Sequence, residues 1–225
     1  SRHRERASCG RGRMGLAAPG LAGVDPLING TAMQDDLIVQ QPAGAQHLVL
    51  LFHGVGSHAS DLLPLGKALA PHMADALIVS VQAPAAQGSG RQWFSVQGVT
   101  EANRPARVAA TMPRFARAVR EWQLASGIDT ASTTLIGFSQ GAIMALESTQ
   151  TDRPPAGRVI ALSGRFAQPP QVAPKATRVH LIHGDADRVM PVHLAEDALA
   201  QLQALGGQAT LDRFPGLGHG IDSRV

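Results

Sequence analysis

The sequence predicts an α/β fold in which a mostly parallel sheet carries helices on both faces. From residue 33 onward, short apolar runs alternate with segments of helical periodicity, and no internal repeat is evident. Strands that alternate with helices build parallel sheets, because each crossover helix packs back onto the sheet. A length of 225 residues, with 44% hydrophobic and 16% charged side chains, suits one globular domain with a substantial core.

Each element is predicted from its own pattern. The longest helix is expected over residues 104–125, where apolar side chains recur at spacings of three and four until Gly127 ends it. Residues 83–103 are rich in Gly, Pro and Gln and are predicted to form a loop. The other predicted helices cover 62–72, 142–147 and 191–205, and the predicted strands are an edge strand at 37–41, buried strands at 47–52 and 76–81, one ending before Gly137, and further strands at 158–162, 178–182 and 209–214.

The stretch TTLIGFSQGAIMALES, residues 133–148, holds the pattern Gly-x-Ser-x-Gly between an apolar run and a helix-forming run. This context is typical of the nucleophile elbow of α/β-hydrolases, in which Ser139 projects its hydroxyl from a sharp turn. The backbone at Gly137 and Gly141 must then pass very close to the neighbouring helix and strand, which leaves no room for a bulky Cβ. The alternative is a Gly-rich turn whose serine caps a helix.

Two aspartates follow the apolar strand that ends in HLIHG, at the edge where catalytic groups gather in open α/β sheets. An acid there can accept the Nδ1–H of a histidine and so fix the tautomer of that histidine. We choose Asp187 for this role, since Asp185 lies close enough to the Gly184 turn to be a turn former. His180 and His183 are not expected to share a metal ion, because their spacing on a strand points the rings to opposite faces.

His219 is flanked by glycines in the stretch PGLGHG, just after the last predicted strand. A histidine on such a loop can reach the serine as a general base. It completes the chain order Ser139, Asp187, His219, which is the order of the α/β-hydrolase triad. Most of the other eight histidines are expected to be structural.

The stretch FHGVGS follows the first buried strand and is predicted to supply half of an oxyanion hole. Gly54 and Gly56 let the backbone turn the Val55 N–H towards the site. The second donor is the N–H of Gln140, the residue after the nucleophile. His53 is expected to make structural hydrogen bonds rather than to act in catalysis.

Five ordered motifs, FHGVGS, QAPAAQGSGRQWFSVQG, LIGFSQGAIMALES, LIHGDADRVMP and GLGHGID, resemble the carboxylesterase/phospholipase family that includes the acyl-protein thioesterases. The resemblance runs from about residue 35 to residue 225. Within the family, the sequence is similar above all to the bacterial predicted-esterase branch. It implies an α/β-hydrolase fold without a large lid, no cofactor, and hydrolysis of carboxylic esters or thioesters. By motif position it assigns the nucleophile to Ser139, the acid to Asp187, the base to His219 and the oxyanion donors to Val55 and Gln140.

The resemblance also implies a substrate loop and shows two departures. Arg91, Trp93 and Phe94 match the family's loop beside the acyl pocket and are expected to contact substrate, with plain core packing as the alternative. Ser57 stands where many relatives have an acid directly after H-G-x-G, which leaves the anchoring of that loop open. Relatives continue for a final helix after the catalytic histidine, so the end at Val225 predicts that this closing helix is missing.

Residues 1–32 are Arg-, Gly- and Ala-rich without periodicity and are predicted to be a disordered head before an α/β-hydrolase domain at 33–225. We interpret the head as upstream sequence, with a targeting peptide as the alternative, because its apolar run is short and broken by Pro19 and Gly20. Cys9 is the only cysteine, which rules out an intrachain disulfide and a Cys-based zinc site. Such cysteine usage suits a cytoplasmic location.

The net charge of +3 at pH 7 does not indicate nucleic-acid binding. Five arginines and two acidic residues within 1–32 account for the whole of it, so residues 33–225 are neutral and show no basic stripe. No apolar run approaches the roughly 18 residues of a membrane span, so stable membrane insertion is not expected.

The sequence therefore predicts a serine hydrolase for short- to medium-chain esters or thioesters of small molecules, working as a monomer or homodimer. Two alternatives remain open. A small-peptide hydrolase would use the same fold and triad, and ester and amide substrates would tell the two apart. An inactive or truncated hydrolase-like protein, lacking the closing helix, would only bind a ligand or partner.

Overall fold

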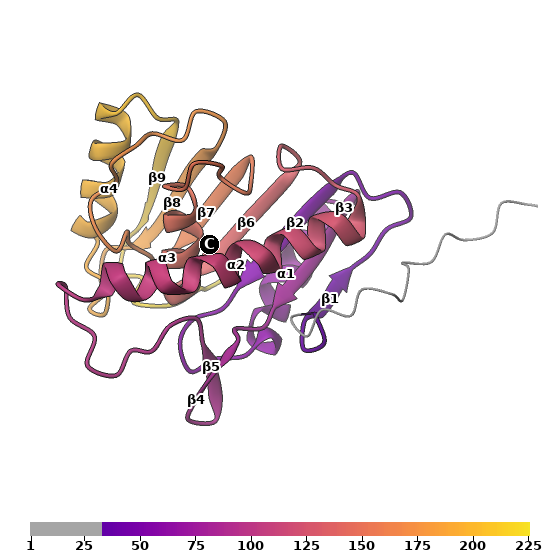
Figure 1. Ribbon diagram of the computed structural model, residues 1–225, viewed down its shortest axis with the longest axis horizontal. Helices are drawn as coiled ribbons and strands as arrows, with labels where there is room; N and C mark the ends of the chain where they lie inside the picture. Colours follow the sequence, from indigo (N-terminus) through magenta and orange to yellow (C-terminus); the bar gives the residue numbers. More distant parts are fainter. Residues whose placement is uncertain (1–32) are drawn as a thin grey trace, which may run out of the picture.

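The computed structural model describes residues 33–225, and the predicted disordered head at 1–32 lies outside the described residues. The predicted α/β class is confirmed, with a seven-stranded sheet and helices on both of its faces (Figure 1). The strands of the sheet are β1 (Leu37–Gln40), β2 (His47–Phe52), β3 (Ala76–Val81), β6 (Thr133–Phe138), β7 (Arg158–Leu162), β8 (Arg178–Gly184) and β9 (Ala209–Phe214). The helices are α1 (Leu63–Leu69), α2 (Arg104–Ser126), α3 (Gln140–Ser148) and α4 (His193–Ala204).

The sheet runs in the order β1-β3-β2-β6-β7-β8-β9. The edge strand β1 is antiparallel to β3, and every other neighbouring pair is parallel. Apolar side chains of α2, α3 and α4 pack on one face, around the fully buried Phe52 and Phe115, while Leu65 and Leu69 of α1 pack on the other. Because both faces of its centre are covered, β3 is buried along its whole length.

Parallel register brings the carboxyl ends of the central strands to one edge of the sheet. Phe52 pairs with Gly137, Phe138 with Leu162, and Leu162 with Ile182. The loops that leave these strands therefore meet at the same edge, which is where open α/β sheets place their ligands and catalytic groups. This register assembles the candidate site.

Two predictions of local structure need correction. The loop predicted at 83–103 contains an antiparallel hairpin, β4 (Ala85–Gln87) and β5 (Gly90–Gln92), which projects from the body in Figure 1. Its three-residue arms are too short to show the alternation that marks a strand. The helix predicted at 62–72 is α1 flanked by 3-10 turns at Ala59–Leu62 and Ala70–His72. Pro64 is the second residue of α1, and Pro71 is the second residue of the turn that follows it.

Candidate active site

Ser139 occupies a strained turn between β6 and α3. Its backbone φ is 52°, a value that residues other than glycine rarely adopt. Its N–H donates to Leu162 O at 3.0 Å. A Cβ on Gly137 would overlap the backbone of Gly141, and one on Gly141 would overlap the carbonyl oxygen of Phe52. The prediction that these two positions have no room for a side chain is confirmed.

The structure brings Ser139, His219 and Asp187 into one hydrogen-bonded chain. His219 Nε2 lies 2.9 Å from Ser139 Oγ, and His219 Nδ1 lies 2.8 Å from Asp187 Oδ2. Since an ionised carboxylate only accepts, Nδ1 carries the proton and donates it, which leaves Nε2 free to accept from the serine hydroxyl. This is the arrangement in which an imidazole can take a proton from an alcohol.

The Asp187 side chain is fully buried, and its partners keep it ionised. Its Oδ1 accepts the N–H groups of Val189 at 2.9 Å and Met190 at 2.8 Å. Burial acts to raise the pKa of Asp187, but hydrogen bonds from Met190, His219 and Val189 outweigh it, so the pKa lies below its usual value. The carboxylate therefore stays charged beside the imidazole at neutral pH.

The alternative acid, Asp185, binds the backbone of another loop instead of His219. Its Oδ1 accepts the Gly216 N–H at 2.6 Å, which ties the β8 loop to the turn that leads to His219. Gly184 makes the same junction tight, because a Cβ there would overlap the carbonyl oxygen of Leu217. The His219 ring packs on Phe138, with ring centroids 5.2 Å apart. The choice of Asp187 over Asp185 as the partner of His219 thus agrees with the geometry.

The loop predicted to carry an oxyanion donor lies against Ser139. A Cβ on Gly54 would come within 3.3 Å of Ser139 Cβ, so the backbone of this loop passes beside the serine. Within residues 33–225, the N–H groups of Val55 and Gln140 donate to no protein acceptor. Both donors remain available for a ligand oxygen.

The anchoring of this loop, left open by Ser57, comes from two sources. Ser57 Oγ donates to Asp61 Oδ2 at 2.6 Å, so an acid four residues further on takes part. Gly56 N–H also donates to Arg91 O at 2.7 Å, and Arg91 N–H to Ser57 O at 2.9 Å. The loop is therefore held by backbone pairing to β5 as well as by a side chain.

Comparison with known proteins shows which family the chain belongs to. The phospholipase/carboxylesterase family matches residues 33–225. The chain belongs to this family. Membership makes it a hydrolase with the α/β-hydrolase fold.

Individual members of the family are similar to this chain over most of its length. The protein of Escherichia coli (strain K12) named Esterase YpfH is 50% identical over 193 residues, which cover 84% of this chain and 83% of that protein. Acyl-protein thioesterase 1 of Kluyveromyces lactis is 31% identical over 173 residues, 68% of this chain and 75% of its own length. The crystal structure of esterase PE8 has a TM-score of 0.73 at 35% identity, covering 82% of this chain and 91% of PE8.

In this family member, the buried side chain of Gln140 joins the turn at Ser139 to the loop after β5. Its Oε1 accepts the Trp93 N–H and its Nε2 donates to Phe94 O, each at 2.7 Å. The indole Nε1–H of Trp93 donates in turn to His53 O at 3.2 Å. Sequence reasoning assigned only the backbone N–H of Gln140, because nothing in a motif shows where an amide side chain points.

His53 and His183 are both buried and structural. His53 Nδ1–H donates to Gly54 O at 2.7 Å, its Nε2 accepts the Ala83 N–H at 3.0 Å, and burial lowers its pKa. His183 Nε2 lies 2.6 Å from Met190 O and 3.5 Å from Asp187 Oδ2. The contact between His183 and Asp187 was missed, because it forms across a turn whose shape the sequence does not reveal.

The structure places the three predicted substrate residues in different surroundings. Trp93 is in the core, in edge contact with Phe52 and Phe115 at centroid distances of 5.5 and 5.3 Å, and Phe94 is also buried. Arg91 Nη2 lies 3.4 Å from Asp35 Oδ2 at the surface. Core packing thus accounts for Trp93, and contact of the three with substrate stays a prediction.

Over residues 33–225, no group of three or more His, Cys, Asp or Glu side chains is arranged to hold a metal ion. In the same part of the chain, no helix combines the length and the apolar character needed to cross a bilayer.

Proposed function

We propose that this family member is a serine esterase and thioesterase that works through an acyl-enzyme formed on Ser139. The observation that carries the proposal is the continuous hydrogen-bonded chain from Asp187 through His219 to the Ser139 hydroxyl. It stands at the carboxyl edge of a parallel sheet, on an elbow that tolerates only glycine at 137 and 141.

In the first half of the reaction, His219 Nε2 takes the Ser139 proton while Oγ attacks the acyl carbonyl carbon. Asp187 stabilises the imidazolium that forms and keeps the ring in its productive orientation. His219 then gives the proton to the leaving alkoxide or thiolate, and an ester of Ser139 remains. In the second half, His219 removes a proton from water, which attacks that ester, and returns the proton to Ser139 Oγ as the bond to the acyl group breaks and the acid leaves.

The N–H groups of Val55 and Gln140 are assigned to stabilise the negative charge that develops on the carbonyl oxygen. Support comes from their lack of protein acceptors and from the contact of the Gly54 loop with Ser139. Gln140 also begins α3, whose N-terminal N–H groups favour negative charge. Losing one such donor typically costs about 10²–10³ in kcat.

We further propose short- to medium-chain acyl esters and thioesters as substrates. The names of the E. coli esterase and the K. lactis acyl-protein thioesterase support the two bond types. A cytoplasmic location and a monomeric or dimeric state remain part of the proposal; the single cysteine supports the location.

The test is hydrolysis of p-nitrophenyl esters from acetyl to palmitoyl by wild-type protein and by variants at the triad. Ser139→Ala should lower kcat about 10⁶-fold. Asp187→Asn should lower it about 10⁴-fold, because asparagine favours the wrong histidine tautomer. Asp185→Asn is the matched control: it alters a carboxylate two residues away, keeps an acceptor for the Gly216 N–H, and should retain most of the activity.

Equal losses in Asp185→Asn and Asp187→Asn, or full activity in Ser139→Ala, would contradict the assignment. The matching p-nitroanilides measure the rival peptidase activity, which should be far weaker.

A further inference from the structure

A cavity lies beside the loop that holds Asp187. Its volume is about 420 Å³, and its lining includes Glu101, Arg104 and Arg165 together with Val189, Met190 and Leu194. A volume of this size is within the range that accommodates small ligands.

Two segments that contact residues of the proposed triad contribute to the lining of the cavity. The Val189 and Met190 N–H groups bind Asp187, so one wall is the acid loop itself. Arg165 lies three residues after Leu162, whose carbonyl oxygen accepts the Ser139 N–H. Three residues span at most about 10 Å, so the Cα of Arg165 lies within about that distance of the Cα of Leu162.

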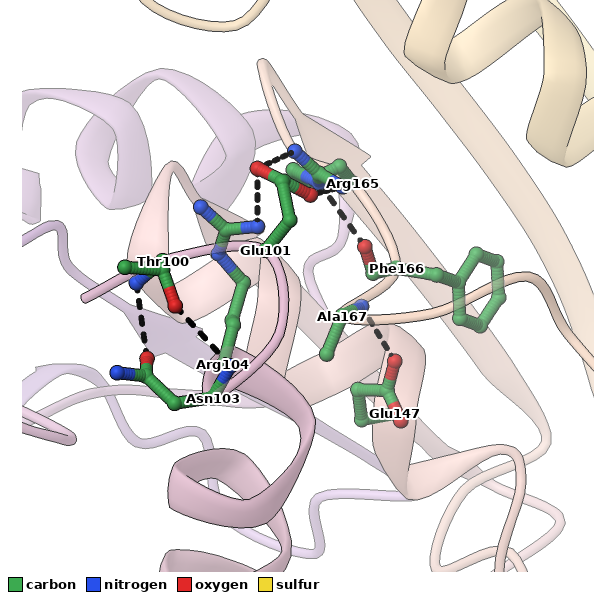
Figure 2. Close-up of polar contacts among 8 residues, drawn as sticks. All are labelled: Thr100, Glu101, Asn103, Arg104, Glu147, Arg165, Phe166 and Ala167. Atoms are coloured by element: carbon green, nitrogen blue, oxygen red, sulfur yellow. Dashed lines mark hydrogen bonds and ion pairs between the residues drawn. The ribbon is translucent and has the colours of Figure 1, made fainter.

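Two guanidinium groups in this cavity share one carboxylate (Figure 2). Arg165 binds Glu101 through both oxygens, at 3.1 and 2.7 Å, and Arg104 Nη1 lies 2.6 Å from Glu101 Oε1. The guanidinium groups of Arg104 and Arg165 hold the pKa of Glu101 below its usual value, so the cluster carries one net positive charge at neutral pH. Arg104 Nη1 meets Glu101 Oε1 as an ion pair, and among the described residues this nitrogen has no other acceptor.

The arginine and glutamate side chains of the cluster differ in their exposure to solvent. The side chains of Arg104 and Arg165 are 15% and 18% exposed, whereas that of Glu101 is 70% exposed. Buried guanidinium groups need an anionic partner, because removing the partner leaves an uncompensated charge in a poorly solvated site. A largely exposed carboxylate can move into water at small cost, and another oxyanion can take its place.

We propose that Arg104 and Arg165 form a subsite for an oxyanion, a carboxylate or phosphate, carried by the acyl chain or leaving group of the substrate. Planar guanidinium groups bind carboxylate and phosphate through paired hydrogen bonds, as Arg165 already does with Glu101. Glu101 occupies the subsite when no such substrate is bound. This inference rests on the proposed esterase function and adds a preference for anionic substrates.

The larger cavity next to it is less suited to an anion. It measures about 770 Å³, lies between α4 and residues 165–170, and shares Glu101, Arg165 and Leu194 with the smaller one. It has no Arg104 in its wall, and it adds the exposed carboxylate of Asp197. The oxyanion therefore belongs to the smaller cavity, near Met190.

The test compares two p-nitrophenyl esters with six-carbon acyl groups, the neutral hexanoate and the anionic monoester of adipic acid, after subtraction of spontaneous hydrolysis. The readout is the ratio of kcat/KM for the anionic ester to that for the neutral one. Arg165→Gln and Arg104→Gln should each lower this ratio about tenfold to a hundredfold, the usual effect of a lost hydrogen bond to a charged group. Glu101→Gln should raise the ratio, since the internal competitor is gone.

Arg114→Gln is the matched control, because Arg114 is an exposed arginine of α2 outside both cavities, and its ratio should equal that of the wild type. Ratios unchanged in both Arg165→Gln and Glu101→Gln would overturn the subsite and leave the cluster as a structural ion pair. Glu101→Gln keeps the size of an exposed side chain and leaves both arginines in place, so this arm of the test does not depend on how well the arginine variants fold.

Failure of the proposed function would look different, since the wild type would hydrolyse neither ester. In that case calorimetry still decides, with adipate as the probe of the wild type and of Arg165→Gln. Adipate should bind the wild type more tightly than the variant. Equal binding of adipate by the two proteins would overturn the subsite.

Discussion

At the scale of single residues, Gln140 serves the site twice. Its backbone N–H is the proposed oxyanion donor, and its buried amide holds the N–H of Trp93 and the carbonyl of Phe94. Trp93 in turn donates to the carbonyl of His53, the residue before the loop that lies against Ser139. One amide therefore connects the two halves of the proposed oxyanion hole through a single aromatic residue.

Replacing this amide should cost stability. In Gln140→Leu, the buried N–H of Trp93 and the carbonyl of Phe94 each lose a partner, and an unpaired buried polar group costs about 1–3 kcal/mol. We expect the free energy of unfolding, measured by urea denaturation, to fall by about 2–5 kcal/mol. The control Gln171→Leu removes an exposed amide that donates to Pro169 O, and it should change stability by less than about 0.5 kcal/mol. Similar losses in both variants would contradict this account of Gln140.

At the scale of elements, the elbow works because β2, β6 and α3 approach more closely than side chains permit. Gly141 lies in the first turn of α3, where alanine would be the better helix former, yet its Cα faces the carbonyl oxygens of Phe52 and His53. Those oxygens belong to the end of β2 and to its loop and cannot move aside as a side chain can. The packing of three elements thus overrides local helix propensity at this position.

Gly141→Ala should therefore destabilise the fold by about 3 kcal/mol or more, since the new Cβ overlaps backbone atoms. Gly218→Ala provides the contrast, because a Cβ there meets nothing within 4 Å and should shift stability by less than about 1 kcal/mol. Thermal unfolding of the two variants beside the wild type measures both effects. A melting temperature of Gly141→Ala close to that of the wild type would show that β2 and α3 can separate without loss.

The elements that the sequence predicted well are those with strong local patterns. β2 and β3 are continuous apolar runs with the predicted bounds, and α2 keeps its apolar periodicity up to Gly127, whose φ of 70° lets it end the helix. The β4–β5 hairpin has no such pattern, because its arms pair with each other over three residues each.

The same distinction holds within the candidate site. Ser139, Asp187 and His219 stand in motifs with a fixed chain order, so their meeting could be predicted. The hydrogen bond from Gly216 to Asp185 and the cluster of Glu101, Arg104 and Arg165 join segments far apart in the sequence. Such contacts depend on loop conformation, which no periodicity encodes.

At the scale of the whole molecule, one carboxylate ties the edge of the sheet to the longest helix. Asp36 stands just before β1, and its two oxygens accept the Gln82 N–H after β3 at 2.8 Å and the Trp122 Nε1–H of α2 at 2.7 Å. Burial raises the pKa of Asp36 from 3.8 to about 6 and outweighs these two hydrogen bonds, which act to lower the pKa. The fold therefore keeps a proton on this group at pH values where the unfolded chain has released it.

This difference predicts how stability varies with pH. Below pH 3.8, Asp36 is protonated in both states and the contribution of its raised pKa is fully present; as pH rises through about 6, the contribution is lost. A difference of about two pKa units corresponds to about 3 kcal/mol. Asparagine does not titrate, so the stability of the wild type relative to Asp36→Asn should fall by about that amount between pH 3.5 and 7.

Urea denaturation of both proteins across this pH range measures the change, and taking the difference removes groups with opposite shifts, such as Asp187. A flat difference between the wild type and Asp36→Asn would mean that water reaches Asp36 and that the segment before β1 packs more loosely on α2 than the hydrogen bond from Trp122 implies.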